Sequence, residues 1–393
     1  MTGADTSPAP GSVTGAPPDS LGTGAAGTAL HHIVRARTGS GTWVVAHESA
    51  AAMTRRPVTA HPDLAGLYRG APAAGYVLHT GGHAAYDTAL TTLDHHITTL
   101  TRQRLDQAHR RIDQQRLPAL REYDLISGLT GLGVQLLHRD RHPELLRDIL
   151  GYLVRLTEPL HHDGDQLPGW WCAHSPNDHP APAWAGGHGN LGLAHGITGP
   201  LALLATATRR GIVVDGHAEA IDRISGWLDR WRVGTGTRAW WPGRITRHEH
   251  HSGVLRQTGP QRPSWCYGTP GIARARQLAA LALHDHRRQR AAEDALTGCA
   301  TDPDQLAHLH DATLCHGLAG LLLTTWRAAA DARTDALHDS VPGLRDRLAR
   351  HLEQHGPPTG SGLLDGHDGV DLVRDTLGRP SVTRWDLCLL TSG

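Results

Sequence analysis

The apolar residues of this chain recur mainly at intervals of three and four positions, which is the spacing of one face of an α-helix. The pattern is clearest in LGVQLL, PLALLATA, IARARQLAALAL, LAGLLLTTW and VDLVRDTL. The alternation expected of a half-buried strand is scarce, and WVVA after Thr42 is the only strand-like run. The pattern therefore predicts a nearly all-helical protein.

Each of these apolar runs follows a Gly-x-x-Gly element, so the chain is internally repetitive. Five copies begin 68, 72, 49 and 49 residues apart, at Gly128/Gly131, Gly196/Gly199, Gly268/Gly271, Gly317/Gly320 and Gly366/Gly369. GGHAAYDTAL, with Ala85 at the second glycine position, is interpreted as a degenerate sixth copy. Each spacing has room for two helices and their loops, so the repeating unit is a helix pair.

Helix pairs that cannot bury their apolar faces alone must stack as an open solenoid or close into a ring. Glycine at the start of every inner helix favours closure, because it lets crowded backbones approach each other. It also leaves the N–H groups of the helix N-termini facing a central cavity. The predicted fold class is all-α, an α,α-toroid of repeated helix pairs around that cavity.

The domain organisation follows from composition. Residues 1–28 are rich in Gly, Ala, Pro, Ser and Thr and carry hardly a large apolar side chain, so we expect a disordered tail there. Residues 29–393 are predicted to form one toroid domain. The polar stretch 91–121 is the candidate for a small insertion.

Charge and composition exclude some classes of partner. Lys plus Arg and Asp plus Glu each total 38, so no net field attracts nucleic acid or an anionic membrane. The first residues lack a basic segment followed by an apolar one, and no run of about 18 apolar residues occurs, so we expect a cytoplasmic protein without a transmembrane segment. Five Cys in a chain without a secretion signal favour metal or catalytic use over disulfides.

Three candidate metal ligands directly precede repeat glycines. SWCYGTPG contains Cys266, and LCHGLAG contains Cys315 and His316, so the three side chains occupy equivalent places in neighbouring repeats. Two thiolates and an imidazole suit Zn²⁺, and three protein ligands leave a fourth position open, as in catalytic sites. The alternative, from spacing alone, is that each Cys is a small buried hydrophobe.

The chain resembles the lanthionine synthetase C-like family in several motifs that occur in the same order. These are YDLISGLTG, GLAHGITG, SWCYGTPG, LCHGLAG and the ending GLLDGHDGV with RWDLCLL, and the similarity spans residues 75–393. The resemblance implies an α,α-toroid. It also implies that Cys266, Cys315 and His316 are zinc ligands, because they match the Cys of the family's WCYG motif and both residues of its CHG motif.

Four further residues are candidates for catalysis. His195 stands one residue before a repeat glycine, close to the place that Cys266 has two residues before its own. A neutral imidazole suits a general acid or base; the alternative is a solvated His among 30. Asp124 matches an acidic residue of the family and would orient His195, or else cap a helix.

Arg262 and Tyr267 flank Cys266 and match family positions near the metal, where they would stabilise a developing enolate oxygen. Their alternatives are a salt bridge and a packed aromatic ring. RHEHHS at residues 247–252 lacks the spacing of a zinc protease helix, and Cys172 reads most simply as a core or substrate-facing residue. Cys299 and Cys388 are interpreted as structural thiols.

The activity implied by the resemblance is the addition of Cys thiols of a peptide to dehydroalanine and dehydrobutyrine, which forms lanthionine and methyllanthionine rings. The expected partners are a dehydrated precursor peptide and a lanthipeptide dehydratase, with no nucleic acid. Two alternatives remain: an enzyme that joins glutathione to dehydroamino acids, and a zinc-bearing scaffold without activity. A glycosidase or terpenoid enzyme would need paired carboxylates or an aspartate-rich motif, and neither lies beside the repeat loops.

Overall fold

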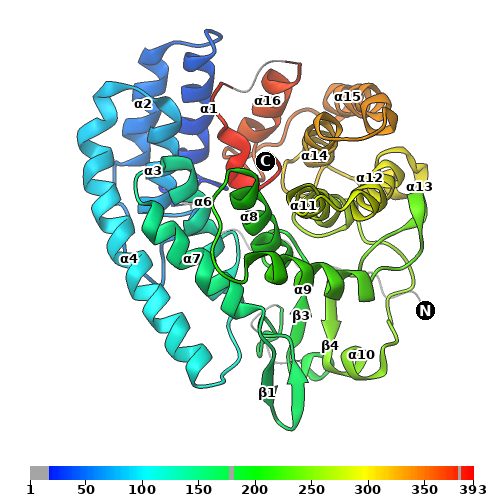
Figure 1. The fold of residues 1–393 in the computed structure, drawn as a ribbon. Coiled ribbons are helices and arrows are strands. Elements are labelled where there is room, and N and C mark those ends of the chain that lie inside the picture. The colour runs from blue at the N-terminus through cyan, green and yellow to red at the C-terminus, as the bar shows by residue number, and fades with distance from the viewer. Residues whose placement is uncertain (1–16, 177–180, 379–381) are drawn as a thin grey trace.

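Helices dominate the computed structural model, which describes residues 17–176, 181–378 and 382–393. They form a closed ring of helix pairs (Figure 1), so the prediction of an α,α-toroid is confirmed. The inner helices in the described residues are α1 (Ala25–Arg37), α3 (Ala71–Gly81), α6 (Leu129–Arg139), α8 (Thr198–Arg209), α11 (Thr269–Ala282), α14 (Leu318–Ala330) and α16 (His367–Thr376). The outer helices are α2 (Trp43–Met53), α4 (Asp87–Asp113), α7 (Pro143–Leu156), α9 (His217–Arg230), α12 (His286–Thr301) and α15 (Ala336–His355).

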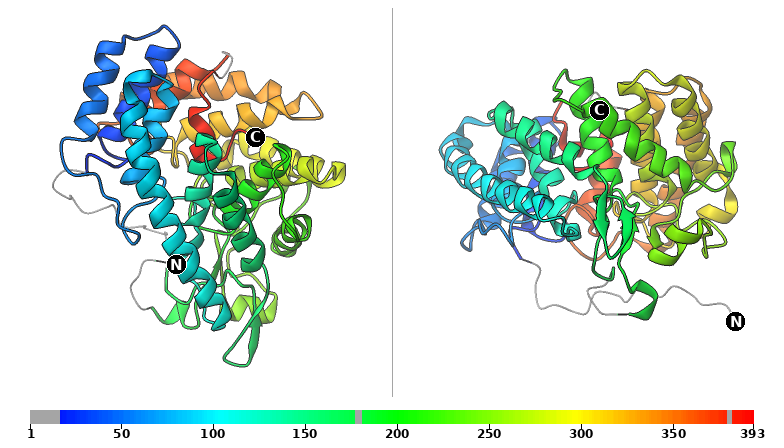
Figure 2. Two further views of the ribbon diagram at one scale, coloured as in Figure 1. Left: turned by 60° about the vertical axis from the view of Figure 1, so that its left-hand side comes forward. Right: turned by 60° about the horizontal axis from the view of Figure 1, so that its bottom comes forward.

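Packing between neighbours closes the ring. Each inner helix packs against the next one along the chain, and α16 packs against α1. Each outer helix covers the inner helix that precedes it, as the two turned views in Figure 2 show. Short helices and strands fill the connections: α5 (Leu120–Tyr123), α10 (Arg247–Ser252), α13 (Pro303–Leu306), β1 (Leu160–His162), β2 (Asp165–Leu167), β3 (His188–Asn190) and β4 (Arg244–Thr246).

A buried carboxylate on α16 joins the last inner helix to the first. Asp368 accepts hydrogen bonds from Thr28 Oγ1 (2.7 Å) and from the N–H of Gly362 (2.8 Å), and its other oxygen lies 3.0 Å from His31 Nδ1. Burial alone would raise the pKa of Asp368, but these hydrogen bonds outweigh it and lower the pKa to about 2. The carboxylate therefore stays charged and holds α1 against α16.

The second glycine of each repeat is required by a close approach. A Cβ atom built there would come closer than 3.0 Å to the carbonyl oxygen of the residue six positions earlier, in the loop that precedes the helix. The pairs are Gly27 with Leu21, Gly131 with Leu125, Gly199 with Leu193, Gly271 with Trp265, Gly320 with Leu314 and Gly369 with Leu363. The first turn of each of these helices thus lies directly on its own loop.

Replacing Gly320 by alanine is expected to lower the free energy of unfolding by about 1 to 3 kcal/mol, because the new methyl group overlaps the backbone of Leu314 and the loop must shift. The control is Gly226→Ala on the exposed face of α9, where a Cβ meets nothing within 4 Å. That change should raise stability by about 0.5 to 1 kcal/mol through helix propensity. Urea titration checks both values, and equal effects of the two substitutions would refute the close approach.

The predicted disordered tail of residues 1–28 includes residues that are ordered. Residues 1–16 lie outside the described residues, but residues 17–28 are part of the toroid, with Leu21 fully buried and α1 beginning at Ala25. The loop before α1 fills the same place as the loops before the other inner helices, and Gly24 and Gly27 form a further Gly-x-x-Gly element. The predicted degenerate copy at Gly82 is wrong, because Gly82 ends α3.

Two local predictions are also wrong. WVVA is not a strand; it opens α2, where the Thr42 side chain caps the helix by accepting from the N–H of Val45. The stretch 91–121 is not an inserted domain, because it consists of α4 and its connection to α5. The apolar face of α4 packs on α3 and α7, so α4 is an ordinary outer helix of the ring.

Among the helices in the described part of the chain, none is long and apolar enough to cross a membrane.

Candidate metal centre and its surroundings

Backbone hydrogen bonds link the loops at one end of the toroid into a closed circle. Each loop precedes an inner helix and donates an N–H group to a carbonyl of an adjacent loop. The links are Leu125 to Ala194 (3.1 Å), Ala194 to Cys266 (3.3 Å), Cys266 to Cys315 (3.2 Å), Cys315 to Leu364 (2.9 Å), Leu364 to Gly22 (2.9 Å), Leu21 to Tyr68 (2.9 Å) and Tyr68 to Ile126 (3.3 Å). This circle fixes equivalent residues of neighbouring repeats next to each other.

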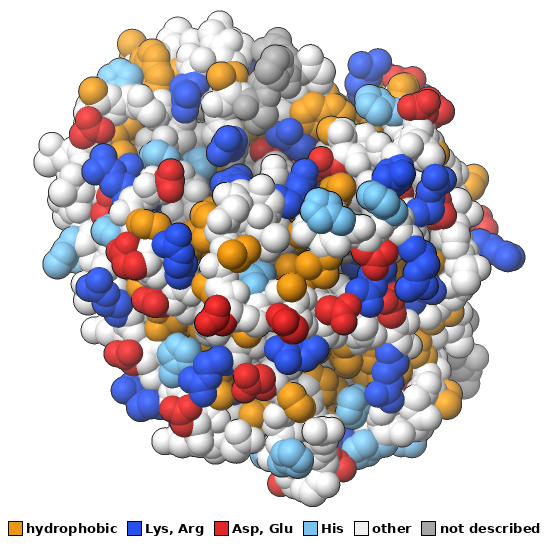
Figure 3. Space-filling model, viewed as in Figure 1, with side chains coloured by type: hydrophobic (Ala, Val, Ile, Leu, Met, Phe, Trp, Pro, Cys, Tyr) orange, Lys and Arg blue, Asp and Glu red, His pale blue; other side chains and the backbone are white. Residues whose placement is uncertain are grey.

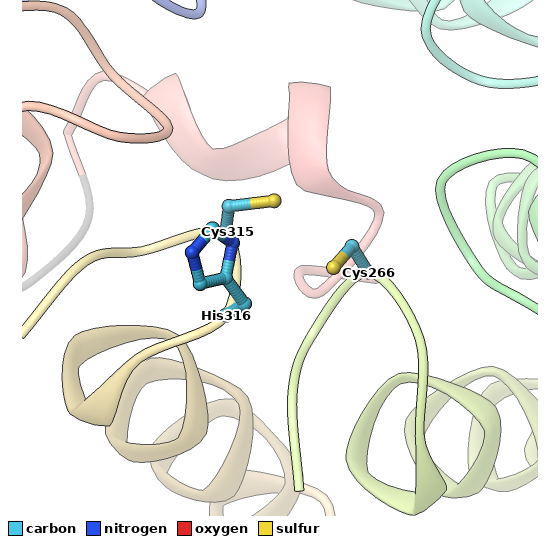
Figure 4. Close-up of side chains that lie close together, drawn as sticks. All are labelled: Cys266, Cys315 and His316. Atoms are coloured by element: carbon cyan, nitrogen blue, oxygen red, sulfur yellow. The ribbon is translucent and has the colours of Figure 1, made fainter. Parts of the chain in front are cut away.

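Cys266, Cys315 and His316 come together in this circle. Cys266 lies in the loop before α11, and Cys315 and His316 lie in the loop before α14 (Figure 4). Their two sulfur atoms and a ring nitrogen lie within 4.8 Å of one another. Cys266 is buried, and the other two are partly exposed, so the cluster is open on one side. The sequence prediction that these three side chains converge is met by the geometry.

The cluster concentrates negative charge on one sulfur. The pKa of the Cys266 thiol is held well below its usual value, because hydrogen bonds with Cys315, His316 and Ser264 outweigh the effect of burial. The thiolate in turn raises the pKa of Cys315 well above its usual value. A thiolate, a thiol and an imidazole at this distance form a site to which a soft cation would bind.

Two carboxylates face the imidazole of His316. Asp311 Oδ2 lies 3.6 Å from Nε2, and Asp365 Oδ1 lies 3.9 Å from Nδ1. The hydrogen bond to Cys266 is the main cause that raises the pKa of His316, and Asp311 adds to it. Asp311 is itself fixed by the N–H and hydroxyl of Thr313. If His316 binds a metal, these two carboxylates are placed to orient its ring, and the sequence did not reveal them.

His195 and Asp124 form a pair one repeat away. His195 Nδ1 lies 2.6 Å from Asp124 Oδ2, and Oδ1 of the same carboxylate accepts the N–H groups of Ser127 and Gly128 at 2.7 Å. Asp124 thus fixes the loop before α6 and contacts His195, but it does not cap α6, whose N-cap is Gly128 and has no side-chain capping hydrogen bond. Burial lowers the pKa of His195, but the hydrogen bond and charge of Asp124 outweigh it, so the pKa is raised above 6.5.

Asp124→Asn should lower the pKa of His195, because the hydrogen bond and the charge that mainly oppose the effect of burial are lost. A raised pKa in the folded state stabilises the protein below about pH 6.5, and this contribution is lost as the pH rises through the folded-state value. The variant should therefore lose more stability at pH 5.5 than at pH 8. NMR titration of the ring, assigned by its absence in His195→Asn, checks the shift, and an unchanged pKa would contradict it.

Tyr267 lies beside this pair and contacts two polar side chains, Asn190 and Arg244, which we call its polar frame. Its ring centroid is 6.3 Å from that of His195, its hydroxyl accepts a hydrogen bond from Asn190 Nδ2 at 2.9 Å, and the guanidinium of Arg244 lies 4.8 Å from the ring centroid. Asn190 and Arg244 are opposite each other in the β3–β4 pair. Burial raises the pKa of Tyr267, so the phenol keeps its proton near neutral pH.

Arg262 is exposed in the loop before Cys266. The pKa values of Cys315 and His316 are both raised, and the positive charge of Arg262 opposes each rise, so Arg262 lies near the cluster. Among the described residues its side chain makes no ion pair or hydrogen bond, so the salt-bridge alternative is not seen there.

The remaining Cys and His candidates lie elsewhere. Cys172 is buried, with its backbone paired to His188. RHEHHS forms α10, where Thr246 and Glu249 make a capping box and His251 pairs with Asp165 at 2.9 Å. Burial raises the pKa of Cys299 and of Cys388 to about 12, so both are neutral thiols, as expected of structural ones.

The helical toroid and its Cys–Cys–His cluster define the class: a closed helical barrel with a candidate metal centre where the loops meet. The profile of one family, described as lanthionine synthetase C-like protein, matches residues 16–390. The chain belongs to this family.

Two known proteins are similar to the chain. The nisin biosynthesis protein NisC of Lactococcus lactis subsp. lactis is 24% identical over 257 residues, which cover 64% of this chain and 60% of that protein. The solved structure of a nisin cyclase superposes with a TM-score of 0.78 at 21% identity, over 95% of this chain and 92% of that one. At this identity the second comparison supports the fold, which agrees with the helical ring described above.

Proposed function

We propose that this protein is a zinc-dependent lanthipeptide cyclase. In the proposed reaction a Cys thiol of a dehydrated peptide adds to the β-carbon of a dehydroalanine or dehydrobutyrine in the same peptide. The observation that carries the proposal is the convergence of Cys266, Cys315 and His316 next to the His195–Asp124 pair. Family membership supports the same activity.

The donor set fits zinc. A tetrahedral zinc with bonds of about 2.0 to 2.3 Å places its ligand atoms roughly 3.3 to 3.8 Å apart, so atoms within 4.8 Å need only a small contraction. The lowered pKa of Cys266 favours its thiolate, which is the form that binds a cation. Zinc held by Cys266, Cys315 and His316 would supply thiol activation, because coordination deprotonates a thiol near neutral pH.

The proton balance assigns a task to His195. The S–H bond of the substrate breaks, a bond from sulfur to the β-carbon forms, and the α-carbon must gain one proton; no electrons are exchanged with a cofactor. The raised pKa of His195 favours the protonated form of its ring, so His195 is suited to deliver that proton. Asp124 holds the ring in place and stabilises its charged form.

Tyr267 and Arg262 are suited to the carbonyl group of the dehydroamino acid. Addition at the β-carbon moves negative charge onto that oxygen before the α-carbon is protonated. The Tyr267 hydroxyl accepts from Asn190, so its own proton remains available for donation, and Arg262 adds a positive charge near the cluster. Donors that meet charge as it develops lower the barrier to the reaction.

The test is thiol consumption on a dehydrated peptide that contains free Cys. Ring formation leaves the peptide mass unchanged, so a thiol-alkylating reagent is added after the reaction and the adducts are counted by mass spectrometry. The proposal predicts that the number of adducts falls with increasing time of incubation with the enzyme, and persistence of all adducts would refute it. Addition of glutathione to the same peptide, with a gain in mass, would instead identify an intermolecular enzyme.

A further inference from the structure

A second concentration of charge lies at the end of the toroid away from the metal centre, near the C-terminal ends of α8 and α14. A cavity of about 300 Å³ opens there, lined by Arg209, Arg210, Arg327 and Arg384 together with Ser392 and Gly393. In the view of Figure 3, basic side chains gather around the place where Figure 1 marks the C-terminus. None of these residues takes part in the proposed thioether chemistry.

The charges around this cavity do not balance. Asp331 pairs with both Arg209 (3.0 Å) and Arg274 (2.7 Å), and Asp386 pairs with Arg327. The side chains of Arg210 and Arg384 make no ion pair or hydrogen bond with any residue that the structure describes. Of the four arginines that line the cavity, Arg209 and Arg327 are therefore paired, and Arg210 and Arg384 are not. The C-terminal ends of α8 and α14 offset only about half a charge each.

Several hydrogen-bond donors of the cavity also lack partners within the described residues. Nη2 of Arg327 and Oγ of Ser392 are buried without a hydrogen bond. Burial, and then the charge of Arg384, lower the pKa of Arg210, so these two guanidinium groups lie close enough to repel each other. Asp140 contributes to Arg210 only from beyond ion-pair distance.

We propose that this cavity binds a phosphate-type oxyanion. An arginine fork matches the oxygens of a phosphate group, and charge-assisted hydrogen bonds of this kind are roughly twice as strong as neutral ones. The unpaired guanidinium groups of Arg210 and Arg384 supply such donors. A cavity of about 300 Å³ has room for a phosphate group and its first waters.

The bound anion would hold the C-terminal segment over the ring. Arg384 immediately precedes the 3₁₀ helix Trp385–Leu389, and the Tyr76 hydroxyl on α3 donates to the carbonyl of Trp385 at 2.9 Å. Trp265, the neighbour of Cys266, donates Nε1–H to the carbonyl of Leu389 at 2.9 Å. Neutralising Arg384 would therefore stabilise the C-terminal segment.

The experiment measures phosphate binding by calorimetry and the melting temperature in phosphate against chloride of equal ionic strength. We expect saturable phosphate binding and a rise in melting temperature that saturates with it. Arg210→Gln and Arg384→Gln should each weaken phosphate binding more than about tenfold. Without phosphate, the same changes should raise the melting temperature, because each removes an unneutralised charge. Arg290→Gln, at an exposed position on α12, should change neither property.

The melting temperature without phosphate separates a binding site from a structural role. An arginine that only holds the fold together would lower the melting temperature when replaced and would leave phosphate binding intact, which would overturn the proposal. Equal effects of phosphate and chloride would also overturn it. Tighter binding of ADP than of phosphate would assign the cavity to the phosphate of an organic ligand, and equal binding to free phosphate. Cyclisation by these variants should stay at the wild-type rate, so the outcome is independent of the proposed function.

Discussion

Cys315→Ala is expected to lose bound zinc and cyclisation together while the toroid stays folded. The substitution removes one of three ligands and leaves Cys266 and His316, which cannot form the three-ligand set of a catalytic site. A free thiol with a pKa near about 8.5 is only about 3% ionised at pH 7, so loss of activation alone costs about 30-fold in rate. Lost positioning of the substrate sulfur adds to this, and the total should exceed 30-fold.

Zinc analysis after dialysis and the thiol-consumption assay measure the two effects. Cys299→Ala is the matched control. Cys299 is a buried thiol on the outer helix α12 that donates a hydrogen bond to Gln305, and its side chain lies outside the cluster. This variant should keep its zinc and its rate. A Cys315→Ala protein with full activity would refute the proposed role of the cluster.

His195→Asn, unlike Cys315→Ala, should keep its bound zinc while its cyclisation rate falls about 10² to 10⁴-fold. Asparagine can still bond to Asp124 but cannot deliver a proton near neutral pH. The wild-type rate should fall as the pH rises through the raised pKa of His195, and the variant should lose this dependence. Without that dependence in the wild type, His195 would not be the proton donor.

The control for this variant is His248→Asn on α10, an exposed imidazole away from the loop circle. It should leave the rate and its pH dependence unchanged. Loss of zinc from His195→Asn would show that the pair supports the metal centre instead of protonating the product.

The glycines made the ring predictable from sequence, because the same steric demand recurs at each inner helix. A Cβ at Gly271 or Gly320 would overlap the preceding loop, so the residue type is forced and the repeat becomes visible. Since Cys266 and Cys315 each stand just before such an element, their convergence could also be predicted. At α3 the demand is met differently, with Gly70 at the N-cap and alanine three residues later, and the sequence interpretation chose the wrong copy.

Composition misled the interpretation of the N-terminal segment. The residues around Gly24 and Gly27 are small and weakly hydrophobic, which is also typical of disordered chains. Their order comes from packing against the far end of the sequence, where Leu363 donates its N–H to the carbonyl of Leu21. No local pattern contains that contact, although the Gly-x-x-Gly spacing was a usable signal.

The polar frame of Tyr267 could not be predicted because it depends on strand pairing. Asn190 and Arg244 are 54 positions apart and meet only through the β3–β4 register. Both strands are three residues long, too short for an alternating pattern to stand out. Asp365, near His316, is likewise placed by a loop from another repeat.

The central claim is that Cys266, Cys315 and His316 hold a zinc ion with one position left for the substrate thiol. X-ray absorption at the zinc edge, recorded with and without a thiol-containing dehydrated peptide, tests it most directly. The account predicts two sulfur ligands in the free protein and three when the peptide is bound, with the imidazole present in both. Four protein ligands in the free protein, or an unchanged sulfur count on binding, would contradict it.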